Sequence, residues 1–330
     1  AQLNRVICKY NLDMMLVIGP GHAGPVMSTN SYLDGSYTKL YPKITQNETG
    51  LKKLYKSFSF PGGIGSHAAP ETPGSIHEGG ELGYTISHAV GAVLDNPELI
   101  SVAFIGDGEA ETGPLMTSWL SNVFINPVND GAVLPVLHLN GAKISNPTIL
   151  SRKSNEELNK LFEGFGWKPI FIDASTEGNV HLHASQKFDE AIETILNIQR
   201  KSREKKAEEA TLAKWPIIIF RSEKGWTGPI EYKGKLIQGS FRAHQIPIEA
   251  NSNASQDELL ILERWLKSYR PEELFDNEGK FLLDRYNISP DDDHKMSLSK
   301  YINNGDKYKL SVPDWKEYAQ KIDVPGKKDA

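Results

Sequence analysis

Apolar positions along this chain follow two periods, one typical of buried strands and one typical of helices. Short and nearly continuous apolar runs occur at residues 14–18, 101–105, 134–139, 168–173 and 215–220. Longer segments with apolar residues at helical spacing occur at 3–10, 82–94, 117–123, 155–162, from about 180 onwards, and at 256–267. Strands that alternate with helices predict βαβ units, and therefore an α/β fold with a mostly parallel sheet flanked by helices.

The segment 58–83, FSFPGGIGSHAAPETPGSIHEGGELG, interrupts this alternation. It is rich in glycine and proline, and it carries His67 and His77. Loops of this length are usually functional or disordered, and the embedded Phe58 and Phe60 argue against disorder. We expect an ordered loop that forms one wall of a site.

Two polar residues follow neighbouring predicted strands. Asp107 lies in GDG directly after the run 101–105, and Asn140 follows the run 134–139. The carboxyl ends of parallel strands open onto one crevice, so the two side chains are expected to lie side by side. Carboxylate and amide oxygens suit a hard cation such as Mg²⁺, which often shares its ligands with a diphosphate. Glycines at 106 and 108 would let the backbone approach phosphate oxygens closely.

Other charged residues surround this predicted crevice. Glu109 and Glu111 follow the turn, and we expect both to accept hydrogen bonds from backbone amides nearby. The strand at 215–220 leads to Lys224 at the same edge of the sheet, where a cation suits a phosphate. His244, in FRAHQIP, is expected on an exposed loop.

A nicotinamide enzyme is the rival interpretation, because the loop GPGHAGP at 19–25 fits the pattern G-x-G-x-x-G. That fingerprint requires a helix that opens directly from the loop, and Pro20 and Pro25 are expected to resist one. A second strand ending in an acidic residue is also missing at the expected distance. We therefore interpret His22 as a polar group held on a tight turn at a strand end.

Composition narrows the classes of function. The net charge of −5 and the lack of a dense Lys/Arg stripe make nucleic acid and anionic membranes poor partners. Cys8 is the only cysteine, and no apolar run approaches the roughly 20 residues that cross a bilayer, so we expect a cytoplasmic protein. Ala1 in place of a start methionine, and the linker-like residues 324–328, suggest part of a longer protein.

Six segments together resemble the phosphoketolase family, which uses thiamine diphosphate. They are GPGHAGP, SFPGGIGSHAAPETPGSIHEGGELGY, GDGEAETGP, LHLNGAKISNPT, SEKGWTGP and FRAHQIP. The resemblance extends from about residue 3 to residue 274. It implies a transketolase-type domain that binds the cofactor's diphosphate, at 1–275, followed by a polar extension and the start of an interdomain linker at 276–330.

The resemblance also implies an activity. Phosphoketolases cleave xylulose 5-phosphate or fructose 6-phosphate with inorganic phosphate, through adducts on thiamine diphosphate, to give acetyl phosphate and an aldose phosphate. A homodimer is implied as well. Because family members are longer and their C-terminal domains help to activate the cofactor, this chain alone is expected to be inactive. A transketolase-like thiamine enzyme and a noncatalytic domain that retains the fold remain the alternatives.

Individual positions take roles from this resemblance. The implied Mg²⁺ ligands are Asp107, Asn140 and the backbone carbonyl of Ala142, where relatives usually carry an aromatic residue. The implied cofactor contacts are Gly79, Gly106, Asp107, Gly108, Glu109, Asn140 and Lys224. The implied catalytic groups around the sugar and phosphate are His22, His67, His244 and Lys224.

Overall fold

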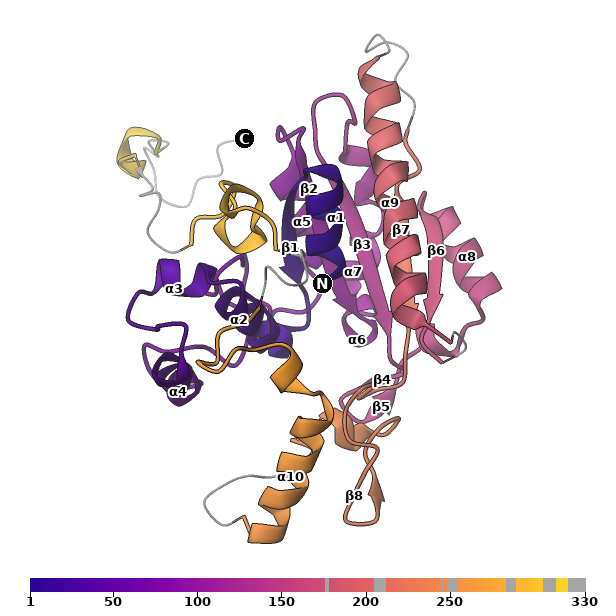
Figure 1. The fold of residues 1–330 in the computed structure, drawn as a ribbon. Coiled ribbons are helices and arrows are strands. Elements are labelled where there is room, and N and C mark those ends of the chain that lie inside the picture. Colours follow the sequence, from indigo (N-terminus) through magenta and orange to yellow (C-terminus); the bar gives the residue numbers. More distant parts are fainter. Residues whose placement is uncertain are drawn as a thin grey trace, which may run out of the picture.

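A five-stranded parallel sheet forms the centre of the molecule (Figure 1). The computed structural model describes residues 1–175, 178–204, 212–244, 246–248, 254–282, 289–304 and 313–319. In sheet order the strands are β1 (Asp13–Ile18), β2 (Leu99–Gly106), β3 (Ala132–Leu139), β7 (Pro216–Arg221) and β6 (Lys168–Asp173). All four pairings between neighbouring strands are parallel, which confirms the predicted fold class.

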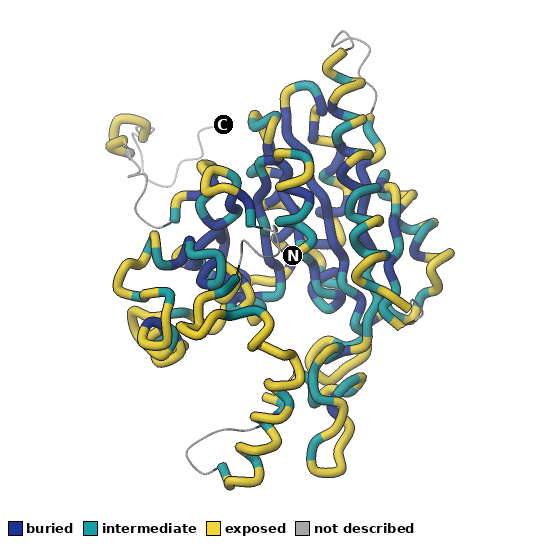
Figure 2. Tube along the Cα trace, in the orientation of Figure 1, coloured by how far each residue is buried: buried dark blue, intermediate teal, exposed yellow. Residues whose placement is uncertain are grey.

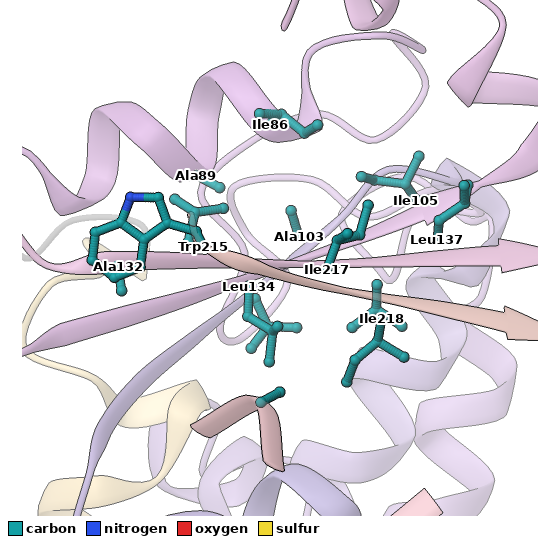
Figure 3. Close-up of a cluster of buried hydrophobic side chains, with 14 of the residues drawn as sticks. Ile86, Ala89, Ala103, Ile105, Ala132, Leu134, Leu137, Trp215, Ile217 and Ile218 are labelled. Carbon is teal, nitrogen blue, oxygen red and sulfur yellow. The ribbon is translucent and has the colours of Figure 1, made fainter. Parts of the chain in front are cut away.

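Side chains on the two faces of the sheet alternate, and both faces are buried. Figure 3 shows Ile86 and Ala89 of helix α5 (Thr85–Val93) over Ala103 of β2, while Leu134 and Ile218 point to the opposite side. Successive strand residues point to opposite faces, so a continuous apolar strand needs cover on both. Figure 2 shows the strands as the buried centre of the chain.

Helices cover the two faces. On one face lie α5, α7 (Gly113–Ser118) and α8 (Asn155–Gly164), where Trp119 after α7 meets Phe162 of α8 edge-on at 5.0 Å. On the other face α9 (Val180–Arg203) packs on β6 and β7, and α1 (Gln2–Tyr10) packs beside α9. An apolar cavity of about 470 Å³ lies on that face between α9 and α2.

Local sequence signals set several helix ends. The helix α8 begins with a capping box, in which Ser154 and Glu157 each bond to the other's backbone N–H. Ser255 and Glu258 form the same box at the start of α10 (Gln256–Ser268). Such boxes satisfy amide groups that have no partner in the first turn, so the sequence places these helix starts correctly.

The loop after β1 differs from our expectation. A 3₁₀ turn at Gly21–Ala23 leads directly into α2 (Gly24–Leu33), whereas the prolines were expected to prevent a helix there. Pro25 occupies the first turn, where a helix needs no backbone N–H donor. The shorter helices α3 (Ser36–Leu40) and α4 (Glu48–Ser57) follow.

The helix predicted at 256–267 is present as α10. Its apolar spacing leads one to expect packing on the domain, but α10 does not pack there. It has no buried residue, and with the hairpin β8 (Glu231–Tyr232) and β9 (Lys235–Leu236) it projects from the body (Figure 1). Tyr232 and Lys233 of the hairpin both bond to Glu258 of the helix. The two elements therefore form one arm.

Part of the predicted extension at 276–330 packs against the domain. His294 Nδ1 lies 2.9 Å from Asp13 Oδ1, Lys295 Nζ donates to Asp34 O at 2.8 Å, and Ile302 is 1% exposed. The domain boundary near 275 stays a prediction. Among the described residues, no helix is both long and apolar enough to cross a membrane.

Candidate functional site

Strand register brings the predicted polar residues to one edge of the sheet. Gly106 of β2 pairs with His138 of β3, and Leu139 of β3 pairs with Arg221 of β7. Asp107, the loop from Asn140, and the loop that carries Lys224 therefore leave three neighbouring strands at the same end. The helix expected between β2 and β3 consists of shorter pieces, α6 (Asp107–Ala110), α7 and a 3₁₀ turn at Ser121–Phe124.

Asp107 fastens the end of β2 to the loop after β3. Its carboxylate is 2% exposed, and Oδ2 accepts hydrogen bonds from the backbone N–H groups of Asn140 (3.1 Å) and Gly141 (2.8 Å). The Thr148 hydroxyl donates to the same oxygen at 2.9 Å, and the Gly108 N–H donates to Oδ1 at 3.0 Å. The expected proximity of Asp107 and Asn140 is therefore present.

Three oxygens at this edge fit a hard cation. Asp107 Oδ1, Asn140 Oδ1 and the Ala142 carbonyl each accept one hydrogen bond, from Gly108 N–H, Ala142 N–H and Lys224 Nζ respectively. An sp² oxygen has two lone pairs, so each retains one for a metal. The set contains only oxygen donors, as Mg²⁺ prefers. Among the described residues, no group of three His, Cys, Asp or Glu side chains offers a rival metal site.

Lys224 lies beside the proposed metal ligands. It is 8% exposed, and its ammonium group donates to Ala142 O at 2.9 Å. Burial lowers the pKa of Lys224, while the nearby Asp107 carboxylate acts in the opposite direction. A buried ammonium group near three oxygen ligands suits an anion that also binds the metal.

Two of the predicted histidines, His22 and His244, lie near Lys224, and His67 lies near His22. Their catalytic roles stay predictions. The rings of His22 and His244 make an edge-on contact at 5.1 Å. Partial burial lowers the pKa of His22, and the proximity of His244, His67 and Lys224 lowers it further. Burial also lowers the pKa of His244, with a smaller contribution from Lys224. Both shifts favour the neutral imidazole, the form that can accept a proton.

Backbone hydrogen bonds join the glycine-rich loop at 19–25 to the glycine-rich loop at 58–83. Ala68 N–H donates to Gly21 O at 2.9 Å, and Gly79 N–H donates to Ala68 O at 2.8 Å. The backbone therefore holds His22, His67 and Gly79 together. Part of the segment 58–83 is thus held against the loop at 19–25, and its role as one wall of a site stays a prediction.

Glu109 and Glu111 accept hydrogen bonds from backbone amides, as expected. The donors lie in other loops and not in the turn that carries the two glutamates. Glu109 is 2% exposed and accepts from Gly83 N–H at 3.2 Å and from the Thr85 hydroxyl. Burial raises the pKa of Glu109, and these hydrogen bonds partly offset the rise. Glu111 accepts from Leu150 N–H at 3.2 Å and pairs with Lys143 at 2.7 Å. Cofactor contact by Glu109 stays a prediction.

Sequence reasoning missed three residues at this edge. Thr148 donates to Asp107, and His138 Nε2 lies 2.7 Å from Ser222 Oγ. An imidazole inside the apolar run LPVLHL was the available signal for His138. Neither Thr148 nor Ser222 stands out from the sequence around it.

Comparison with known proteins shows the family of the chain. The family model described as "XFP N-terminal domain" matches residues 1–307. A protein named xylulose-5-phosphate phosphoketolase from Lactiplantibacillus pentosus is 54% identical over 320 residues, 97% of this chain. A probable phosphoketolase from Clostridium acetobutylicum is 52% identical over 327 residues, 99% of this chain. The chain belongs to the phosphoketolase (XFP) family.

These matches cover only part of each phosphoketolase. The chain spans 40% of the L. pentosus protein and 41% of the C. acetobutylicum protein. Among solved structures, transketolase from Campylobacter jejuni matches with a TM-score of 0.49 at 16% identity, covering 92% of this chain and 41% of that one. Transketolase from Leishmania mexicana matches with a TM-score of 0.48 at 15% identity, covering 82% of this chain and 38% of that one.

Proposed function

We propose that this chain is the part of a phosphoketolase that binds Mg²⁺ and the diphosphate of thiamine diphosphate. The enzyme would cleave xylulose 5-phosphate, fructose 6-phosphate or both with inorganic phosphate, giving acetyl phosphate and an aldose phosphate. One observation carries this proposal: the Asp107 carboxylate accepts hydrogen bonds from the backbone N–H groups of Asn140 and Gly141. These bonds hold the three candidate oxygen ligands close together, beside Lys224.

Each group at the crevice has a role suited to this reaction. Asp107, Asn140 and the Ala142 carbonyl would hold Mg²⁺, and Lys224 would hold a phosphate by its charge. Thiamine diphosphate, when bound, would supply the carbon nucleophile that attacks the ketone group of the sugar phosphate. The neutral imidazoles of His22 and His244 would accept and return protons at the sugar hydroxyls, with His67 beside them. The glycine backbones at 79, 106 and 108 would lie against the cofactor.

Binding of thiamine diphosphate tests this proposal. Titration calorimetry on this chain is expected to detect weak binding with MgCl₂ present and none with EDTA, because metal and diphosphate share the site. Magnesium-independent binding, or no binding at all, would contradict the proposed site. We expect no acetyl phosphate from fructose 6-phosphate with this chain alone, because the missing C-terminal domains would complete the site.

The reaction class needs a separate assay on a full-length protein that contains this chain. Acyl phosphate formation that depends on inorganic phosphate supports the phosphoketolase reaction. Transfer of the ketol group to an aldose acceptor would instead favour a transketolase-like enzyme. Absence of both activities would favour a noncatalytic domain.

We also propose a homodimer in the cytoplasm, and an exposed apolar surface supports the dimer. The helix α5 packs against α7 and the turn at Ser121–Phe124. Large apolar side chains that remain exposed on or beside these elements are Leu82, Tyr84, Leu94, Met116, Leu120, Val123 and Phe124. Exposed apolar side chains that gather on neighbouring elements are typical of an interface.

One substitution at this surface tests the dimer. In the full-length protein, Phe124→Asp is expected to convert dimer to monomer in sedimentation velocity, because it would bury a charge in an apolar interface. Ile230→Asp, at an equally exposed position on the arm, is the control and should leave the dimer intact. A Phe124→Asp dimer of unchanged stability would place the interface elsewhere.

A further inference from the structure

His138 and Ser222 form a polar contact between the ends of β3 and β7. His138 Nε2 lies 2.7 Å from Ser222 Oγ, and the imidazole stacks on Phe220 with ring centroids 5.4 Å apart and planes at 23°. His138 is the only ionisable residue of β3. Stacking on an aromatic ring and a hydrogen bond together fix its orientation.

The contact lies immediately before the two segments that form the proposed site. His138 is two residues before Asn140, and Ser222 is two residues before Lys224. The Ser222 N–H donates to Leu139 O at 3.2 Å, which continues the pairing of the two strands beyond the ladder.

A hydrogen bond joins the same two segments a few residues later in the chain. Lys224 Nζ donates to Ala142 O at 2.9 Å, between residues 82 positions apart in the chain. A lysine side chain has many rotamers, so an ammonium group holds one position only when its backbone and its acceptor are both fixed. The Asp107 carboxylate already fixes the acceptor loop, through Asn140 and Gly141. The contact between His138 and Ser222 lies where it can fix the backbone that carries Lys224.

We propose that His138 and Ser222 are positioning residues that hold Lys224 against the Asn140–Ala142 loop. The three metal ligands and the cation for the diphosphate then form one preorganised unit, and binding does not have to order the lysine. This inference rests on the proposed function of the site. It assigns a role to two residues outside the proposed ligands of the metal and the diphosphate.

Ser222→Ala removes one partner of the contact with little change in volume. The Ser222 hydroxyl also donates to Glu223 O at 3.3 Å, a bond that the substitution removes as well. Titration of this chain with pyrophosphate in the presence of MgCl₂ is expected to show affinity weakened about three- to tenfold, the range for loss of the hydrogen bond to His138. Ser222→Thr retains a hydroxyl and should restore wild-type affinity. Ser87→Ala is the matched control, because it removes a 2.8 Å contact with Ser118 between α5 and α7, and it should bind as wild type.

A double-mutant cycle separates positioning from general loosening of the sheet edge. If Ser222 acts through Lys224, Ser222→Ala has no further effect on pyrophosphate affinity in the Lys224→Met background. An equal loss in both backgrounds would overturn the inference. Wild-type pyrophosphate affinity in Ser222→Ala would overturn it as well.

A labelling experiment tests the inference without any ligand. The rate at which N-hydroxysuccinimidyl acetate acetylates Lys224, followed by peptide mass spectrometry, is expected to be low in the wild type and in Ser87→Ala, and higher in Ser222→Ala. Equal rates in Ser222→Ala and the wild type would show that the contact does not position the lysine. Suppose that the proteins label as expected but the wild type binds no pyrophosphate with Mg²⁺. That result would refute the proposed function and leave the positioning role of Ser222 standing.

Discussion

Replacing Asp107 with alanine is expected to abolish Mg²⁺-dependent binding of thiamine diphosphate and to destabilise the fold. The substitution removes a metal ligand, and loss of even a supporting group at such sites weakens binding by about 10–100-fold. It also leaves the N–H groups of Asn140, Gly141 and Gly108 without their acceptor. An unpaired buried donor costs about 1–3 kcal/mol, and these donors are only partly buried, so the free energy of unfolding should fall by about 3 kcal/mol, the low end for three of them.

Asp130 provides a matched control for this experiment. It is 6% exposed and accepts hydrogen bonds from the backbone N–H groups of Asp95 and Asn126, both at 2.8 Å. It lies just before β3, and so at the opposite end of the strands from Asp107. Asp130→Ala should therefore lower stability while retaining Mg²⁺-dependent binding. Urea unfolding and calorimetry on both variants make the comparison. Wild-type binding by Asp107→Ala would refute the metal site.

Replacing Gly21 with alanine is expected to force the two glycine-rich loops apart. An added Cβ would lie 2.5 Å from Gly79 O and 2.8 Å from Gly80 N, and these are backbone atoms that cannot rotate away. Overpacking of this kind costs about 1–3 kcal/mol of unfolding free energy. Since the same loops carry His22 and His67, binding of Mg²⁺ and thiamine diphosphate should weaken as well.

Gly91 is the control for the loop experiment. It lies within α5, and an added Cβ there meets no atom within 4 Å. Gly91→Ala should raise the free energy of unfolding by about 0.5–1 kcal/mol, because alanine loses less backbone entropy in a helix. Unfolding midpoints measured in urea compare the two variants. A Gly21→Ala protein as stable as the wild type would show that the loops can separate without cost.

Helix predictions succeeded where the determinants were local and failed where they were not. The capping box of Ser154 and Glu157 spans four consecutive residues, so the start of α8 is readable from the chain. Pro25 has two compatible interpretations, as a helix breaker or as a first-turn residue, and the packing of α2 decides between them. The apolar spacing of α10 predicted a helix correctly, but periodicity does not say which surface an apolar face meets.

The sequence by itself determined the strands, the shared edge, and the pairing of Asp107 with Asn140, because parallel strands must bring their carboxyl ends together. Its long motifs also identified the family. Only the tertiary structure decided the atomic partners: Ala142 O for Lys224, and Ser222 for His138. These contacts join segments more than 80 positions apart, and their distances depend on the register between β3 and β7 and on the packing around it, which local patterns do not encode.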